Sequence, residues 1–251
     1  MSAPAYTDDD YTEFDPVETA VDIVRIGVLG SSEVFDHDGY LTAIGGIQPN
    51  TRYLISTHHP RELDKLLGSS FLPEGAEVHI GAVVTDAQSA RRVIPEMDTE
   101  TSFVHFPLVD GPITREIKNM FIANSVRWVV FGSSECTHVM HPDWVRDLRD
   151  FCVLSGISFS FLGWGAWVEN AVSCGRERVV RVPREVSSSF CAVHVTGKVA
   201  LCPSNPINPF VRGESGWTVL RRVNGSDDSH LLDGRLWDEA PFDLLDDEPT
   251  R

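Results

Sequence analysis

The chain has 251 residues, of which 42% are hydrophobic and 23% charged, and its net charge is −16. This composition suits one large α/β domain, and no segment approaches the roughly 18 consecutive apolar residues that a membrane helix needs. The acidic balance disfavours direct binding to a nucleic-acid backbone. We therefore expect a cytoplasmic protein with neither a membrane anchor nor a secretory signal.

The negative charge is concentrated at the two ends of the chain. Residues 1–22 contain seven acidic residues and no basic ones, and residues 227–251 contain nine acidic residues against two arginines. Acidic ends favour solubility; the alternative is a tail that docks on a basic protein partner. Because residues 1–22 hold few aliphatic side chains, we expect them to form a disordered leader.

Short apolar runs from position 24 onward indicate the strands of a parallel sheet. They are rich in Val, Ile and Phe without strict polar alternation, as in strands buried on both faces: Val24–Leu29, Arg52–Ser56, Val78–Val84, Phe103–Phe106, Trp128–Phe131 and Ile157–Leu162. Between them lie amphipathic helices, of which Pro60 opens one, Thr114 can cap a second, and Pro142 opens a third that ends at Gly156. The alternation predicts βαβ units, hence a barrel or a doubly wound sheet.

This alternation stops after Trp167. Residues 168–226 have β-like patterns, at Arg178–Val182, Phe190–Val195 and Trp217–Val223, with Pro and Gly between them. They predict a β-rich arm or insertion near the C-terminus. The expected division is therefore a leader over 1–22, a partial β/α barrel over 23–167, the arm over 168–226, and an acidic segment over 227–251 that packs back on the barrel.

Candidate site residues follow the predicted strands, because reactive groups of β/α barrels lie at the carboxyl ends of the strands. His58, His105 and Glu135 are the candidates for acid–base or metal chemistry. Candidates for ligand binding are Ser31, Ser32, His59, Asp86, Gly132, Ser133, Ser134 and Trp164. Backbone amides of residues 132–134 could cradle an anion. The alternatives are a polar rim for the histidines and ordinary surface positions for the carboxylates.

The cysteines and one neighbouring motif carry possible metal-ligand atoms. The five cysteines, at 136, 152, 174, 191 and 202, form no CxxC pair and are expected to be reduced and mostly buried. Cys136, His138 and His141 carry ligand atoms that suit zinc. Their spacing differs from common zinc modules, and His141 precedes Pro142, where it can cap a helix. We therefore predict no metal site and keep this motif as the alternative.

Four segments, which come in the same order along the chain, resemble segments of a phage- and bacterium-encoded family. That family is radical-SAM-like, has a three-cysteine motif and has a poorly defined role. The four segments are Trp128–Gly132, Met140–Arg149, Gly156–Gly165 and Leu231–Pro241, and the likeness continues upstream to residue 24. The resemblance implies an incomplete TIM-like barrel of radical-SAM type. It also implies a [4Fe–4S] cluster, held by three thiolates near the N-terminus, and S-adenosylmethionine.

The chain departs from this family where the cofactors would bind. No cysteine precedes Cys136, so we expect neither the cluster nor S-adenosylmethionine, and the strand that would carry the motif is expected to be missing. Positions at the barrel mouth differ too: His58 and His59 stand where the family tends to have Lys-Arg, and Thr85 where it has Glu. Core positions thus match the family, whereas positions at the barrel mouth differ from it. This favours a protein that keeps the family's fold but no longer catalyses its reaction.

Three functional hypotheses follow. The first is a non-catalytic pseudoenzyme in the cytoplasm of a phage-infected bacterium, which binds a protein partner or forms a homo-oligomer through the sheet edge left open by the missing strand. The second is an active enzyme, with its cluster supplied by a partner or with a rebuilt His/Glu site at the barrel mouth. The third is a virion-associated structural protein whose acidic ends mediate assembly. The sequence identifies neither ligand nor partner.

Overall fold

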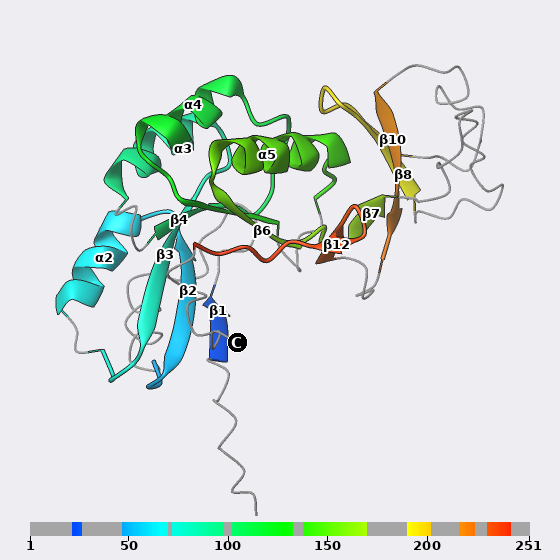
Figure 1. The fold of residues 1–251 in the computed structure, drawn as a ribbon. Helices are drawn as coiled ribbons and strands as arrows, with labels where there is room; N and C mark the ends of the chain where they lie inside the picture. Colours follow the sequence, from blue (N-terminus) through cyan, green and yellow to red (C-terminus); the bar gives the residue numbers. More distant parts are fainter. Residues whose placement is uncertain are drawn as a thin grey trace, which may run out of the picture.

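The computed structural model describes residues 22–26, 47–69, 72–97, 102–132, 138–169, 190–201, 216–223 and 230–241. These ranges form a six-stranded parallel sheet, a four-stranded antiparallel sheet and a two-stranded hairpin (Figure 1). No helix within them is long and apolar enough to cross a membrane.

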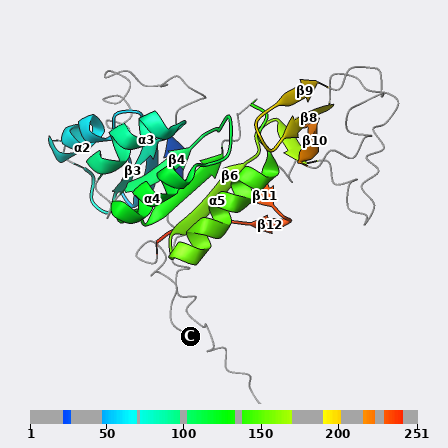
Figure 2. The same cartoon turned by 90° about the horizontal axis from the view of Figure 1, so that it is seen from above.

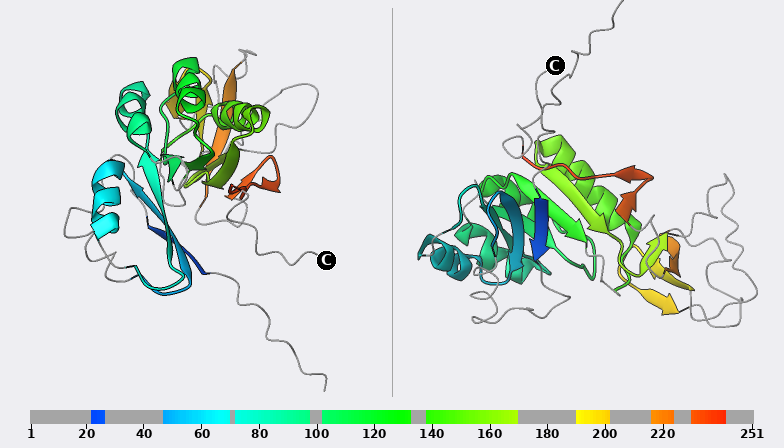
Figure 3. Two further views of the ribbon diagram at one scale, coloured as in Figure 1. Left: turned by 60° about the vertical axis from the view of Figure 1, so that its left-hand side comes forward. Right: turned by 90° about the horizontal axis from the view of Figure 1, so that it is seen from below.

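The parallel sheet has its strands side by side in chain order. They are β1 (Asp22–Ile26), β2 (Thr51–Thr57), β3 (Glu77–Val83), β4 (Ser102–Phe106), β5 (Trp128–Gly132) and β6 (Ser158–Gly163). Every neighbouring pair is parallel, and the sheet curls into half of a barrel (Figure 3). The expected α/β fold with a curled sheet of parallel strands is thus confirmed, and the sheet is consistent with part of a TIM-like barrel. Asp22, assigned to the leader, is the first residue of β1, and residues 1–21 lie outside the described ranges.

Helices cover the outer face of this sheet (Figure 2): α2 (Pro60–Ser69), α3 (Ala87–Val93), α4 (Arg115–Ala123) and α5 (Pro142–Ser155), with a 3-10 turn, η1, at Ile94–Glu96. The predicted start and stop signals act as expected. The hydroxyl of Thr114 accepts the N–H of Ile117, and Gly156 ends α5 in a left-handed conformation with φ 68°. Helix α3 was not predicted, because only Ala90 and Val93 of its seven residues are buried.

Both faces of the sheet are buried, and side chains alternate between them. On β4, Val104 and Phe106 point into the main core, which the helices cover. Phe103, on the concave face, packs in a separate cluster with Trp128, and their ring centroids are 4.9 Å apart. The indole N–H of Trp128 donates to Ser160 at 2.9 Å on the same face. This two-sided burial explains the near-continuous apolar strands.

The second sheet is antiparallel and packs on α5. Its order is β7-β10-β8-β9, with β7 at Trp167–Glu169, β8 at Phe190–His194, β9 at Val199–Leu201 and β10 at Trp217–Arg222. Strands β8 and β10 fall on predicted strands, whereas 178–182 lies outside the described residues. Cys191 and Leu220 share the main core with Trp144 of α5, whose indole N–H donates to the carbonyl of Val195 at 2.7 Å. The core is therefore continuous between the half-barrel and this sheet.

The C-terminal segment lies along the edge of β6. Strands β11 (Leu231–Leu232) and β12 (Arg235–Leu236) form a hairpin, after which the chain runs antiparallel to β6. The N–H of Phe161 donates to the carbonyl of Trp237 at 2.7 Å. This edge of the sheet is thus covered, and β1 forms the opposite edge.

Candidate functional site

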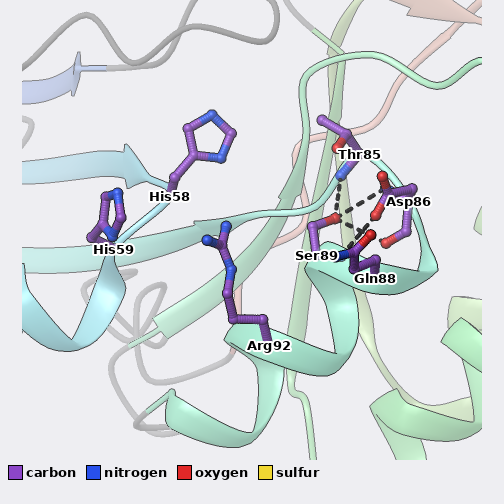
Figure 4. A pocket seen from close by; sticks show the side chains of 7 residues that line it. All are labelled: His58, His59, Thr85, Asp86, Gln88, Ser89 and Arg92. Atoms are coloured by element: carbon purple, nitrogen blue, oxygen red, sulfur yellow. Dashed lines mark hydrogen bonds between the residues drawn. The ribbon is translucent and has the colours of Figure 1, made fainter.

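A pocket of about 570 Å³ opens at the carboxyl ends of β2 and β3 (Figure 4). It is lined by His58, His59, Thr85, Asp86, Gln88, Ser89 and Arg92. Three predicted site residues, His58, His59 and Asp86, meet here because β2 and β3 are adjacent and parallel, so that their carboxyl ends share one edge. The pocket is therefore at the mouth of the half-barrel.

One wall is the turn from β2 into α2, which carries both histidines. The hydroxyl of Thr57 accepts the backbone N–H of His59 at 3.0 Å. The carbonyl of His59 accepts the N–H groups of Glu62 and Leu63 at 3.1 and 3.2 Å, so α2 begins directly after it. These hydrogen bonds hold the turn, in which His58 is half-buried and His59 is exposed.

The opposite wall is the turn from β3 into α3, which is closed by a capping box. The carboxylate of Asp86 accepts the N–H of Ser89 at 2.7 Å, and the Ser89 hydroxyl accepts the N–H groups of Thr85 and Asp86 at 3.0 Å each. The hydrogen bond from the Ser89 N–H lowers the pKa of Asp86. Asp86 is thus an ionised helix cap whose carboxylate is already engaged.

Arg92 supplies the one permanent positive charge among the lining residues, and this charge contributes to the lowered pKa of Asp86. Its side chain extends from α3 toward the two histidines (Figure 4). It makes no hydrogen bond or salt bridge with any described residue, whereas the adjacent Arg91 pairs with Glu116 at 2.6 Å. With the Thr85 hydroxyl, the Gln88 amide and the imidazoles, Arg92 makes the pocket rich in hydrogen-bond donors.

His105 does not line this pocket, although the sequence grouped it with His58. It lies on the concave face of β4, is 4% exposed, and its Nε2 donates to the carbonyl of Gly132 at 3.1 Å. Burial lowers the pKa of His105 to about 4, so the imidazole is neutral near pH 7. Its Nδ1 has no hydrogen-bond partner among the described residues.

A family described as a protein of unknown function, DUF5131, matches residues 38–241. The chain belongs to this family. The match spans every residue that lines the pocket, the second sheet and the C-terminal hairpin. Comparisons with curated proteins and with solved structures give no match.

Other predicted ligand-binding residues of this DUF5131 chain fall elsewhere. Trp164 is a core residue, since its indole N–H donates to the carbonyl of Leu231 at 2.9 Å and its ring packs on Phe161. Gly132 brings β5 close to β6 at Gly163. Ser31, Ser32, Ser133, Ser134 and Glu135 lie outside the described residues, so the anion cradle and the role of Glu135 stay predictions.

The C-x-H-x-x-H motif is only partly described. His138 pairs with the carboxylate of Asp110. The Nδ1 of His141 accepts the N–H of Asp143 at 3.1 Å, and its Nε2 lies 3.2 Å from the Thr218 hydroxyl. Both histidines thus have other partners, and Cys136 lies outside the described residues. Within the described part of the chain, no three His, Cys, Asp or Glu side chains converge on a metal-binding position.

The described thiols do not fit the iron–sulfur cluster that the resemblance implies. Cys152 on α5 and Cys191 on β8 are fully buried in the main core. Burial raises the pKa of Cys152 to about 12, whereas an iron ligand must be a thiolate. Cysteines 136, 174 and 202 lie outside the described residues.

Sequence reasoning missed the α3 wall of the pocket. Gln88, Ser89 and Arg92 were not proposed as site residues, because α3 is short and carries no broad apolar stripe. Its one available signal was Asp86 followed three residues later by Ser89, which is the order of a capping box directly after a strand. That signal would have placed Arg92 on a helix at the barrel mouth.

Proposed function

We propose that this DUF5131 chain is a radical-SAM-like half-barrel that has lost its iron–sulfur site and acts as a non-catalytic binding protein. The observation that carries the proposal is the distribution of thiols. None of the six described strands of the parallel sheet contains a cysteine, and the two described cysteines are buried in the core. A cluster needs several thiolates that converge on its irons.

The described polar residues at the strand ends also support a ligand-binding function rather than a catalytic one. A general acid or base must reach the substrate and exchange a proton with it. Asp86 instead caps α3, and His105 is buried and hydrogen-bonded to Gly132. The alternative of a rebuilt enzyme needs His58 and His105 in one site, and His105 does not line the pocket.

Self-association through β1 belongs to the same proposal. Of the two edges of the parallel sheet, the β6 edge is covered by residues 237–239 of the same chain. Strand β1 pairs only with β2 among the described strands, and an edge strand is a template for pairing with another chain. We expect a homodimer in sedimentation velocity, and a monomer at all concentrations would contradict this part. The proposed phage origin rests on the resemblance, and the proposed cytoplasmic location on the composition and the cysteine spacing of the sequence.

The test of the lost cofactor site is iron analysis of the whole chain after anaerobic purification and reconstitution with ferrous iron and sulfide. We expect no retained iron, no absorption band near roughly 400 nm, and no calorimetric binding of S-adenosylmethionine. A radical-SAM enzyme reconstituted in parallel is the positive control. Retention of about four irons per chain would overturn the proposal, because a cluster site would then exist.

A further inference from the structure

We infer that the pocket at the ends of β2 and β3 binds a small organic phosphate monoester, with Arg92 as its main charged contact. The inference rests on the proposed function, since a binding protein needs a ligand, and it names the chemistry of that ligand. The charges, the donors and the size of the pocket point to this chemistry.

The charge of the pocket favours an anion on one side. Arg92 is the one permanent positive charge among the lining residues, and no described acidic side chain forms a salt bridge with it. Figure 4 shows Arg92 extending toward His58 and His59, with Asp86 at the far end of the α3 turn. An anion on the histidine side therefore meets the Arg92 guanidinium and lies away from the Asp86 carboxylate, of which one oxygen, Oδ1, accepts the Ser89 N–H.

The number of donors favours phosphate over a carboxylate. A guanidinium presents a planar fork of N–H groups that suits phosphate oxygens, and charge-assisted bonds of this kind are short and strong. The Thr85 hydroxyl and the Gln88 amide, which line the pocket beside His58 and His59, can supply further donors to the remaining phosphate oxygens. A carboxylate has only two oxygens and leaves part of this donor set unused.

The size of the pocket calls for more than inorganic phosphate. Its volume of about 570 Å³ lies within the range of roughly 300–1,000 Å³ typical of organic ligands. Hydroxyl groups on the body of such a ligand can donate to the Asp86 carboxylate and pair with the Gln88 amide. Ribose 5-phosphate combines these features and is therefore the probe of choice.

The walls of the pocket are preorganised for a ligand. The α3 wall is fixed by the capping box between Asp86 and Ser89, and the α2 wall by the bond from the His59 N–H to Thr57. These bonds use backbone groups and the side chains of Asp86, Ser89 and Thr57. They do not use Arg92, which is exposed, so replacing Arg92 is expected to leave the fold intact.

The experiment is isothermal titration calorimetry of the whole chain at low salt with ribose 5-phosphate, ribose, inorganic phosphate and acetate. We expect ribose 5-phosphate to bind most tightly, inorganic phosphate to bind more weakly, and ribose and acetate to give no heat of binding. Arg92→Gln should raise the Kd of ribose 5-phosphate about tenfold or more, and His59→Gln should raise it less. The matched control is Arg91→Gln, because Arg91 pairs with Glu116 and does not line the pocket.

The inference is overturned if ribose 5-phosphate and inorganic phosphate both fail to bind at about 10 mM, or if Arg92→Gln binds as tightly as the unaltered chain. Tighter binding of acetate than of inorganic phosphate would also overturn it, in favour of a carboxylate ligand. Thermal melts of each variant show whether a loss of binding comes from unfolding. Iron uptake tests the proposed function separately, so the two failures have different readouts.

Discussion

The Nε2 atom of His105 donates to the carbonyl of Gly132 at 3.1 Å, which joins β4 to β5 on the concave face of the half-barrel. Gly132 lies where the register between β5 and β6 shifts, and its φ of 94° is in the left-handed region. The imidazole thus supplies a hydrogen bond at a point where the ladder of the sheet is irregular. A histidine that the sequence offered for catalysis stabilises the sheet.

This contact predicts that acid destabilises the protein through His105. The pKa of His105 is about 4 in the folded chain and near 6.5 in an unfolded one. The unfolded state therefore binds the proton first, so the stabilisation is complete above about pH 6.5 and is lost as pH falls toward 4. Within this window the free energy of unfolding should fall by about 1.4 kcal/mol per pH unit from this group. Urea denaturation at a series of pH values measures the slope.

The comparison variant is His105→Gln, whose amide can still donate to the Gly132 carbonyl but does not titrate. The carboxylates contribute equally to both proteins, so the difference between the two curves isolates His105. We expect the variant to have the shallower pH dependence between pH 6.5 and 4. Parallel curves would show that His105 does not carry the effect.

Gly132 itself should not tolerate a side chain. A Cβ atom there would press against the Gly163 peptide, whose carbonyl carbon would be 3.2 Å away, and φ is 94°. Gly132→Ala should therefore lower the free energy of unfolding by about 3 kcal/mol. The matched control is Gly156→Ala, which also has a positive φ, of 68°, but has no atom within 4 Å of the added Cβ. It should cost only about 1 kcal/mol, and equal losses would contradict the role of the close contact.

The sequence predicted the parallel strands because the residues of each strand show by themselves that both faces are buried. Each strand is a run of Val, Ile and Phe without polar alternation. The sequence also placed His58 and Asp86 after predicted strands, and the fold brings them together because β2 and β3 are adjacent, parallel and end at one edge. It could not show that His105 is sequestered, since that depends on which face of β4 is covered and on Gly132, 27 residues away. Arg92 was missed because α3 has no amphipathic pattern long enough to read.

The thiol of Cys152 should not react with alkylating reagents in the folded chain. It is fully buried on α5, and burial raises its pKa to about 12, against the opposing effect of the Lys118 charge. The thiolate fraction at neutral pH is then roughly a thousandfold below that of an exposed cysteine. Iodoacetamide labelling followed by mass spectrometry should modify Cys152 only after unfolding in urea. Labelling of the native chain at the rate of a free thiol would contradict this burial.

Asp233 fastens the C-terminal hairpin to α5. Its carboxylate accepts from the Nε of Arg146 at 2.8 Å and from the Nη1 of Arg149 at 2.5 Å, and its φ is 56°. Asn tolerates this left-handed conformation but lacks the charge, so Asp233→Asn tests the ion pairs alone. We expect a loss of about 1 kcal/mol in the free energy of unfolding, since both arginines are only partly exposed. Asp150 is exposed and pairs with the adjacent Arg149, so Asp150→Asn should cost less than about 0.5 kcal/mol.

Hydrogen exchange can show where that loss occurs. The N–H of Phe161 donates to the carbonyl of Trp237, so its protection reports whether the C-terminal segment stays on the edge of β6. In Asp233→Asn this amide should exchange faster, whereas amides of β4, which lies between two strands, should keep rates set by global unfolding. Faster exchange at both places would mean that Asp233 stabilises the whole half-barrel. Unchanged exchange at Phe161 would mean that the backbone pairing holds the segment without the ion pairs.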